Sequence, residues 1–410
     1  MNLKLSKSSI CSSSKIAITG SKSEANRLLI LNALFDQIDI KNLSNSDDTQ
    51  VLQKALSSTE AIIDVHHAGT AMRFLTAYLA IQDNKTRVLT GSSRMQERPI
   101  GVLVDALKML GADISYQDKD GFPPLLITGK TITAQQVTLQ ANVSSQFISA
   151  LVLIAPMLKN GLELILEGQI TSRPYIQMTL SLLESIGVTT EFKDNRIKVY
   201  PVDSSEIKPK IIVVESDWSS ASYYYSIVAL SEVGTTIELS SYYKESLQGD
   251  SALVEIYEAF GVTTTFRDTS IQLTKISTEV KGRLEFNLNN SPDIAQTIAV
   301  TSFAMGISCD LYGLHTLKIK ETDRLIALKT ELTKFGADVT ITDESLHIES
   351  SININSNVAI DTYQDHRMAM AFAPMALKTD VVIRESEVVS KSYPEFWNDL
   401  KSLGIQINKI

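Results

Sequence analysis

Cysteine is scarce in this chain, because its 410 residues include only Cys11 and Cys309. The two lie far apart and have neither a metal-ligand spacing nor the spacing of a redox pair, which argues against a disulfide framework and a cysteine-based metal site. The sequence also lacks the motifs G-x-x-x-x-G-K-[ST], G-x-G-x-x-G, H-E-x-x-H and G-x-S-x-G. Their absence disfavours P-loop, dinucleotide-binding, zinc-protease and serine-hydrolase chemistry. We therefore expect a protein of the reducing cytoplasm without a metal site.

Long hydrophobic runs and an excess of positive charge are missing as well. The longest apolar stretches, Ala150–Leu158 and Met368–Leu377, contain about ten residues, whereas a membrane-spanning helix needs about 20. Ser and Lys are scattered through the first residues, where a signal peptide would have a continuous apolar core. The 38 Lys and Arg against 47 Asp and Glu give a net charge of −9, which opposes unspecific binding to nucleic acid or anionic membranes. We expect no export, no membrane and no nucleic-acid partner.

What the chain does contain is a repeated pattern and, at 44% apolar residues, enough hydrophobic material for two to three domains of about 150 residues each. A polar head, an apolar helix-like run, a short turn and a β-branched strand occur six times. The heads are spaced 47, 75, 75, 73 and 72 residues apart and are anchored at Ser23, Thr70, Ser145, Ser220, Asp293 and Asp365.

A second pattern, an amphipathic helix that ends at a glycine before a strand, follows the second to sixth anchors. Its glycines fit the left-handed residue that ends a helix, and they are Gly111, Gly187, Gly261, Gly336 and Gly404. The first anchor has no such partner, and segment 44–66 is expected to be too short to hold a second helix. The patterns predict six α/β repeats, the first truncated, in two three-repeat domains that meet near Val202–Lys210 or shortly after. An ordinary alternation of helices and strands is the alternative.

Small or acidic polar residues stand at the head of every first helix. Helix N-termini suit phosphate or carboxylate, because they present free N–H groups and a partial positive charge. The simpler interpretation is that Ser21, Ser144, Ser219 and Asp365 are only N-caps. Basic residues at or between the heads favour a small ligand with several negative charges: Lys22, Arg27, Arg73, Arg98, Arg173, Lys320, Arg324, Arg367 and Lys391.

Two carboxylates are placed where such a basic site could use them. Nearby cations and a helix head would keep Asp293 ionised and able to accept a proton, whereas Glu321 would need burial to act as an acid. Each could instead be an ordinary member of an ion pair.

Ten motifs in one order carry a family resemblance: GSKSEANR at 20–27, AGTAMR at 68–73, RMQERPIG at 94–101, SSQF at 144–147, SRPY at 172–175, SSASY at 219–223, LQGD at 247–250, PD at 292–293, KETDR at 320–324 and DHRMAM at 365–370. The chain resembles the 5-enolpyruvylshikimate-3-phosphate synthase family from Ser21 to Lys391. The resemblance implies transfer of the enolpyruvyl group of phosphoenolpyruvate to the 5-hydroxyl of shikimate 3-phosphate. Phosphate would leave from a tetrahedral intermediate, in the pathway to chorismate and the aromatic amino acids.

The implied fold is an inside-out α/β barrel in each of two domains. One domain would consist of residues 1–19 and 216–410, the other of residues 20–215, with the active site in the cleft between them. A monomer that needs no metal or organic cofactor is expected. Glyphosate would occupy the position of phosphoenolpyruvate.

The resemblance also implies roles for individual residues. Asp293 would take the proton of the attacking hydroxyl, Glu321 would protonate the methylene carbon of the enol, and Lys22 would assist as charge changes on the transferred group. Shikimate 3-phosphate would be held by Lys22, Ser23, Arg27, Ser144, Ser145, Ser172, Tyr175, Asp293 and Lys320. Phosphoenolpyruvate would be held by Lys22, Gly69, Arg98, Gln146, Arg324, Arg367 and Lys391.

The chain departs from the family pattern in a few places. The stretch between Arg27 and Ala68 is short, which is expected to remove a helix and its strands from the first repeat. His67 stands where Asn is expected, Phe74 where Pro is expected, and Thr316 where Asn is expected. Two alternatives remain: an enolpyruvyl transferase for a UDP-amino sugar, whose loop cysteine neither Cys11 nor Cys309 matches, and an inactive or RNA-processing module with the same repeats.

Overall fold

The computed structural model describes residues 1–140, 144–168, 170, 173–280 and 282–410. Contacts divide the chain into two compact units, each with its own hydrophobic core. Unit I consists of Met1–Gly20 and Glu215–Ile410, and unit II of Ser21–Val214. In the part of the chain that the structure describes, no helix is long and apolar enough to cross a bilayer.

The second repeat, in unit II, shows the architecture that the others follow. Its four-stranded sheet has the order β4-β5-β7-β6, in which β4 and β5 are parallel and the remaining pairs are antiparallel. Its elements are β4 (Ile62–Asp64), α3 (Gly69–Ala80), β5 (Thr86–Thr90), α4 (Ser93–Gln96), α5 (Gly101–Met109), β6 (Asp113–Tyr116) and β7 (Leu125–Thr128). The third repeat has the same sheet order, with β8 (Gln136–Gln140), α6 (Ser145–Ile154), β9 (Leu162–Glu167), α7 (Arg173–Ser185), β10 (Thr190–Lys193) and β11 (Arg196–Val199).

The first repeat keeps its second helix, contrary to the expectation from the sequence. Segment 44–66 contains an eleven-residue helix, although that helix ends at Ser58 in extended conformation and not at a glycine. What the repeat lacks is two strands, because its sheet has only the parallel pair β12-β3. Its elements are α1 (Lys22–Leu34), β3 (Ile38–Lys41), α2 (Asp47–Ser57) and β12 (Lys210–Val213).

Unit I contains the fourth, fifth and sixth repeats, each with a four-stranded sheet. The fourth comprises β2 (Ser13–Ile16), α8 (Trp218–Leu230), β13 (Thr236–Ser240), α9 (Leu253–Ile256), β14 (Val262–Phe266) and β15 (Ser270–Lys275). The fifth comprises β16 (Leu284–Asn287), α10 (Ala295–Ala304), β17 (Cys309–Tyr312), α11 (Arg324–Lys334), β18 (Val339–Ile341) and β19 (Ser345–Ile348). The sixth comprises β20 (Val358–Ile360), α12 (His366–Phe372), β21 (Val381–Ile383), α13 (Phe396–Leu403), β22 (Gln406–Lys409) and β1 (Leu3–Ser6).

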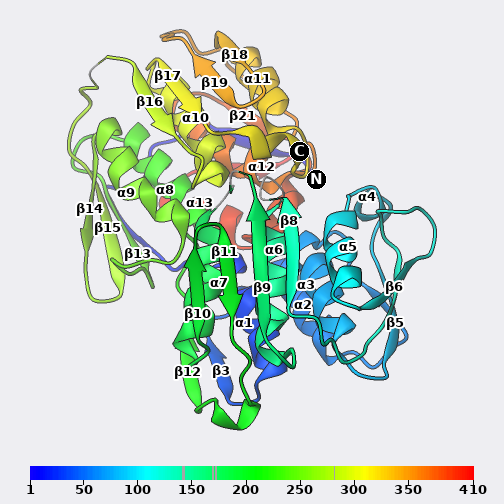
Figure 1. Ribbon diagram of the computed structural model, residues 1–410. Helices are drawn as coiled ribbons and strands as arrows, with labels where there is room; N and C mark the ends of the chain where they lie inside the picture. Colours follow the sequence, from blue (N-terminus) through cyan, green and yellow to red (C-terminus); the bar gives the residue numbers. More distant parts are fainter. Residues whose placement is uncertain (141–143, 169, 171–172, 281) are drawn as a thin grey trace. The chain divides into compact units, whose positions relative to one another are not determined.

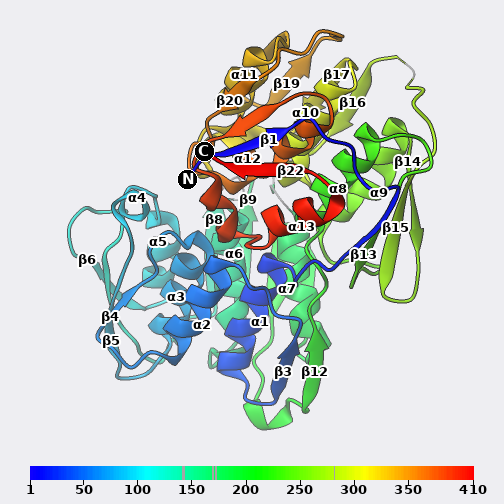
Figure 2. The ribbon, with the colours of Figure 1, turned by 180° about the vertical axis from the view of Figure 1, so that it is seen from behind.

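The sixth sheet joins the two ends of the chain. Strand β1 lies between β21 and β22 and is antiparallel to both, with Leu3 opposite Ile383 on one side and Lys409 on the other. Figure 2 shows β1 and β22 side by side, with both termini next to them. The N-terminal residues therefore complete unit I and not the unit that directly follows them.

The first helix of each repeat lies inside its unit and the sheets lie outside. In unit II, α1, α3 and α6 contact one another, and in unit I, α10 contacts both α8 and α12. These helices are buried on nearly all sides, which explains why their sequences are apolar all round. In Figure 1, the strands β13, β14 and β15 lie outside α8. Helices inside and sheets outside are the predicted inside-out arrangement.

Both sequence patterns are confirmed at the level of the helices. Every anchor from Ser23 to Asp365 lies at the N-cap, in the first turn or in a short 3-10 turn leading into a helix. The five glycines of the second pattern have φ between 73° and 109°, the left-handed conformation that was predicted to end each second helix.

Candidate active site

Three helix N-termini in unit II hold a first group of the predicted residues. Lys22 begins α1, and its Nζ lies 3.7 Å from Oδ2 of Asp48, a carboxylate in the first turn of α2. His67 Nε2 is 3.9 Å from the other oxygen of Asp48. Because Asp48 is only 6% exposed, it holds both basic side chains against the protein. Asp48 is not among the residues predicted from the sequence, although Ser46 followed by two aspartates is a typical helix start that could have revealed it.

The turn at Gly69 is packed closely against two arginines. A Cβ on Gly69 would lie 2.6 Å from Arg98 Nη1, so the guanidinium lies directly on the glycine. Arg73, one helical turn on, donates from Nη1 to the Gly69 carbonyl at 3.2 Å and from Nη2 to the Pro99 carbonyl at 3.2 Å. Arg73 thereby ties the start of α3 to the segment that carries Arg98.

The head of α6 is the third of these helix N-termini. Ser144 is an N-cap, and its side chain accepts a hydrogen bond from the backbone N–H of Gln146. Gln146 donates from Nε2 to Thr70 Oγ1 at 3.3 Å, which links the heads of α6 and α3. Ser145, the first residue of α6, is 8% exposed. Ser172 lies outside the described residues.

Arg27 is buried in unit II and not displayed on its surface. Its guanidinium is 2% exposed and donates to Thr179 Oγ1, Ser149 Oγ and the carbonyls of Ser23 and Tyr175. Burial lowers the pKa of Arg27 to about 10, against the opposing effects of Tyr175 and Glu24. These bonds join α1 to α6 and α7, so the side chain fixes the positions of Ser23 and Tyr175. The ring of Phe74 lies 5.5 Å from the guanidinium, which gives this residue a packing role where the family pattern has Pro.

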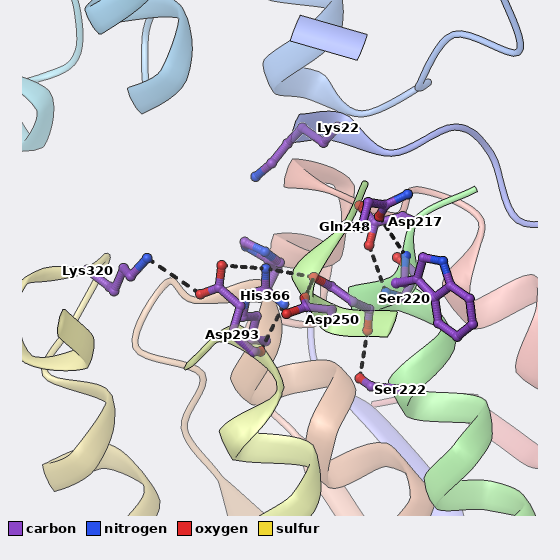
Figure 3. A network of polar contacts seen from close by, with 12 residues as sticks. Lys22, Asp217, Ser220, Ser222, Gln248, Asp250, Asp293, Lys320 and His366 are labelled. Carbon is purple, nitrogen blue, oxygen red and sulfur yellow. Dashed lines mark hydrogen bonds and ion pairs between the residues drawn. The ribbon is translucent and has the colours of Figure 1, made fainter. Parts of the chain in front are cut away.

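In unit I, three basic side chains converge on Asp293 in the 3-10 turn η5 (Pro292–Ile294) before α10. Its carboxylate lies 2.9 Å from Arg324 Nη1, 3.5 Å from Lys320 Nζ and 3.3 Å from Arg367 Nη2. The Arg367 Nη1 group also donates to the Asp293 carbonyl at 3.0 Å. Figure 3 shows Lys320 reaching the Asp293 carboxylate from one side while Asp250 lies on the other.

Arg324 is the centre of this group. It is 1% exposed and contacts Glu321 Oε2 at 2.9 Å and Asp365 Oδ2 at 2.6 Å in addition to Asp293. Burial alone would lower the pKa of Arg324, but the charges of Asp365, Glu321 and Asp293 raise it above its ordinary value. Arg324 therefore stays charged and fixes both proposed proton-transfer carboxylates relative to each other.

Two further predicted positions lie near the sixth repeat and the KETDR segment. Lys391 ends the 3-10 helix η8 (Ser386–Lys391) and donates from Nζ to the carbonyl of Gln364, next to Asp365. Thr316 has a buried hydroxyl with no hydrogen-bond partner among the described residues. The structure thus brings Lys391 to the head of α12.

The simple N-cap interpretation holds for part of the heads. The side chains of Ser144 and Asp365 do cap α6 and α12. Ser21 makes no side-chain capping bond, and Asp217, not Ser219, caps α8. Ser219 instead donates to Asp250 of the LQGD motif and accepts from Arg367 Nη2 at 3.3 Å.

The helix heads of unit II and the Asp293 cluster of unit I both suit small anions. Each places basic side chains at helix N-termini, where N–H groups and the helix dipole favour negative charge. Within the described ranges, no three His, Cys, Asp or Glu side chains come together in a way that could hold a metal ion. Asp293 and Glu321, the two carboxylates singled out in the sequence, both contact Arg324 and therefore lie in the same cluster.

Comparison with known proteins identifies proteins of similar sequence and fold. The family model described as EPSP synthase (3-phosphoshikimate 1-carboxyvinyltransferase) matches residues 51–400. A 3-phosphoshikimate 1-carboxyvinyltransferase of Bacteroides fragilis is 46% identical over 396 residues, which cover 96% of this chain and 95% of that protein. One from Shewanella pealeana is 35% identical over 422 residues, covering 96% and 97%.

Two solved structures share the fold at low sequence identity. The EPSP synthase of Acinetobacter baumannii superposes with a TM-score of 0.81 at 20% identity and full coverage of both chains. The enolpyruvyl transferase NikO from Streptomyces tendae gives a TM-score of 0.75 at 13% identity, with 99% and 98% coverage.

Proposed function

The chain belongs to the EPSP synthase family, and from this we propose that it transfers the enolpyruvyl group of phosphoenolpyruvate to the 5-hydroxyl of shikimate 3-phosphate. It is a transferase of the shikimate pathway, which supplies aromatic amino acids. The observation that carries the proposal is the Asp293 cluster. Three cationic side chains and two proton-transfer carboxylates meet at one helix head within the region that the family model matches.

We propose that the reaction is an addition followed by an elimination. Asp293 accepts the proton of the 5-hydroxyl as its oxygen attacks the substituted carbon of the enol, and Glu321 protonates the methylene carbon. Removal of a proton from that methyl group and cleavage of the carbon–oxygen bond to phosphate then give the product. Lys22 offsets the changing charge of the transferred group. Arg324 contacts both carboxylates and so keeps them at fixed positions relative to each other.

We propose one set of binding residues for each substrate, and Lys22 belongs to both sets. For shikimate 3-phosphate we propose Lys22, Ser23, Arg27, Ser144, Ser145, Ser172, Tyr175, Asp293 and Lys320. For phosphoenolpyruvate we propose Lys22, Gly69, Arg98, Gln146, Arg324, Arg367 and Lys391. The burial of Arg27 favours an indirect role for this residue, because most of its N–H groups bond to the protein. We further propose a cytoplasmic monomer, and the two free cysteines fit a reducing compartment.

Phosphate release tests the function directly. The purified protein should release inorganic phosphate when both phosphoenolpyruvate and shikimate 3-phosphate are present, and none with either alone. Release with a UDP-amino sugar in place of shikimate 3-phosphate would support the other enolpyruvyl transferase. No release with either acceptor would support an inactive module with the same repeats.

We propose that the active site forms where the two units close on the substrates. Basic side chains occur in both, with Lys22 and Arg98 in unit II and Lys320, Arg324 and Arg367 in unit I. A phosphorylated substrate that contacts basic side chains of both units would bind the closed state more tightly than the open one, and its binding would therefore favour closure.

Small-angle scattering should therefore show a smaller radius of gyration with shikimate 3-phosphate than without ligand. Shikimate without its phosphate is the control and should leave the radius nearly unchanged. An identical radius with and without the phosphorylated ligand would contradict closure.

Glyphosate should inhibit the enzyme competitively with phosphoenolpyruvate, and Gly69→Ala should weaken the inhibitor more than the substrate. The new methyl group would meet Arg98 Nη1 at 2.6 Å, so the guanidinium must move away from the turn. Glyphosate is longer than phosphoenolpyruvate, so the added methyl group should obstruct glyphosate more. Steric discrimination by one such group is worth about 1–3 kcal/mol, or about 5- to 150-fold in the ratio of inhibition constant to KM.

Steady-state inhibition of both proteins measures this ratio. Gly101→Ala is a matched control, because Gly101 also begins a helix of unit II but lies against Gly121 and not against an arginine. A natural enzyme that resists glyphosate while using phosphoenolpyruvate normally would show that the Gly69 turn is placed differently from our proposal.

A further inference from the structure

Asp250, in the LQGD motif, is a buried carboxylate to which the proposed mechanism gives no role. It lies in the 3-10 turn η3 (Gly249–Ala252) and is 4% exposed. The neighbouring Gln248 holds this turn against the head of α8, because its Oε1 accepts from the Trp218 N–H and its Nε2 donates to the Ser216 carbonyl. The turn is therefore attached to the helix start that carries Ser219.

A chain of two hydrogen bonds runs from Arg367 to this carboxylate. Arg367 Nη2 donates to Ser219 Oγ at 3.3 Å, and Ser219 Oγ donates to Asp250 Oδ2. A guanidinium can only donate and an ionised carboxylate can only accept, whereas a hydroxyl has one proton and can do both. The ionised Asp250 thus directs the hydroxyl proton of Ser219 away from Arg367, so that the hydroxyl presents a lone pair to the guanidinium.

We propose that Asp250 is a positioning residue that holds the Arg367 guanidinium, through Ser219, in the orientation that binds the anionic groups of phosphoenolpyruvate. The inference rests on the proposed function, in which Arg367 contacts this substrate. Arg367 also contacts both the carbonyl and the carboxylate of Asp293. Ser219 and the proposed base therefore hold the guanidinium together, and Figure 3 shows Asp250 and Asp293 near each other in this network.

The charges around Asp250 make its ionisation sensitive to pH near neutrality. The facing groups are Asp293 from η5, Arg367 from α12 and Asp217 at the cap of α8. Burial raises the pKa of Asp250 to about 7, with Asp293 adding to the rise and Arg367 and the Ser219 hydroxyl opposing it. A protonated Asp250 can donate to Ser219, which reverses the hydrogen bond and removes the directed acceptor for Arg367. KM for phosphoenolpyruvate should consequently rise as the pH falls through about 7.

The test compares Asp250→Asn and Ser219→Ala with Ser222→Ala, a matched control on the same helix. Ser222 donates to the Ser219 carbonyl and contacts Thr297 Oγ1 at 2.9 Å, and it belongs to neither proposed substrate site. KM for phosphoenolpyruvate, KM for shikimate 3-phosphate and kcat are measured between about pH 6 and about pH 8, the range in which a group of pKa about 7 titrates.

Both variants should raise KM for phosphoenolpyruvate about tenfold at pH 8, the order expected for one hydrogen bond to a charged group, with kcat and the other KM within about threefold of the wild type. Asp250→Asn should also lose the pH dependence of that KM, because an amide does not titrate. The double variant should have a KM for phosphoenolpyruvate no higher than that of the single variant with the higher KM, because both changes act on one chain of bonds. Ser219→Ala removes the middle of the chain, and Asp250→Asn replaces its ionised acceptor by a neutral amide that can also donate. Ser222→Ala should behave like the wild type.

Three results would overturn the inference. The first is a wild-type KM for phosphoenolpyruvate in both variants, and the second is an unchanged pH profile of that KM in Asp250→Asn. The third is a lower kcat, a higher KM for both substrates and a lower thermal stability together, which would indicate a merely structural role. A wild-type protein that releases no phosphate would instead overturn the proposed function itself, and the inference with it. If the wild type is active and Asp250→Asn has the same KM for phosphoenolpyruvate, only the inference would be overturned.

Discussion

An Asp293→Ala enzyme is expected to bind shikimate 3-phosphate nearly as tightly as the wild type and to turn it over about 10²- to 10⁴-fold more slowly. That range is the usual contribution of a positioned general base. Asp293 also balances Lys320, Arg324 and Arg367, so removing its charge leaves cations that still attract the phosphate of the substrate. Shikimate 3-phosphate should therefore still bind, but the variant has no carboxylate to accept the proton of its 5-hydroxyl.

Turnover is measured by phosphate release and binding by calorimetry on the same preparation. Asp293→Asn tests whether the charge or only the shape matters, because the amide keeps the size of the side chain without its basicity. Asp343→Ala is a control, since Asp343 pairs with Lys318 on the surface and its side chain is 93% exposed. Near-normal turnover in Asp293→Ala would refute the assignment of the base.

The largest loss of stability is expected from Arg324→Met. Methionine fills much of the space but leaves Asp293, Glu321 and Asp365 without the cation that lies between them. Breaking a buried ion pair by removing one partner costs about 3–5 kcal/mol, because the remaining charge stays buried and uncompensated. For a unit of this size we expect Tm to fall by about 10 °C.

Thermal unfolding followed by calorimetry gives the answer, with Arg384→Met as the matched control. Arg384 pairs with Asp361 at 2.9 Å, but their side chains are 51% and 42% exposed, so its loss should cost at most about 1 kcal/mol. Equal destabilisation by the two changes would show that the Arg324 cluster does not hold unit I together.

Local signals predicted the helix heads and the helix ends. Polar residues before apolar runs fix a helix start, and a left-handed glycine fixes its end, so Ser145 and Gly187 could be placed without any knowledge of the fold. The polar helix heads and the basic residues near them indicated an anion site, and the spacing of the anchors indicated the repeats. Asp293 was found because it follows Ser-Pro at a predicted helix start, and Glu321 because Lys320 and Arg324 flank it in the sequence.

Features that depend on distant residues could not be predicted in this way. Helix α2 was missed because it ends in extended conformation at Ser58, without the glycine on which the pattern relied. An arginine in a polar helix head suggests a surface cation, yet Arg27 is buried by partners on α6 and α7 that are more than 100 residues away. The LQGD motif marked Asp250 but gave it no role, since its contact with Ser219 and, through it, with Arg367 appears only in the fold.

The position of β1 between β21 and β22 sets the order in which the nascent chain can finish its structure. Unit II is continuous from Ser21 to Val214 and has a core of its own, so it can form while the ribosome is still making the rest. Strand β1 is synthesised first but pairs with residues 381–383 and 406–409. Until those last residues emerge, β1 has no partner on either edge, and such unpaired edges can associate with other chains.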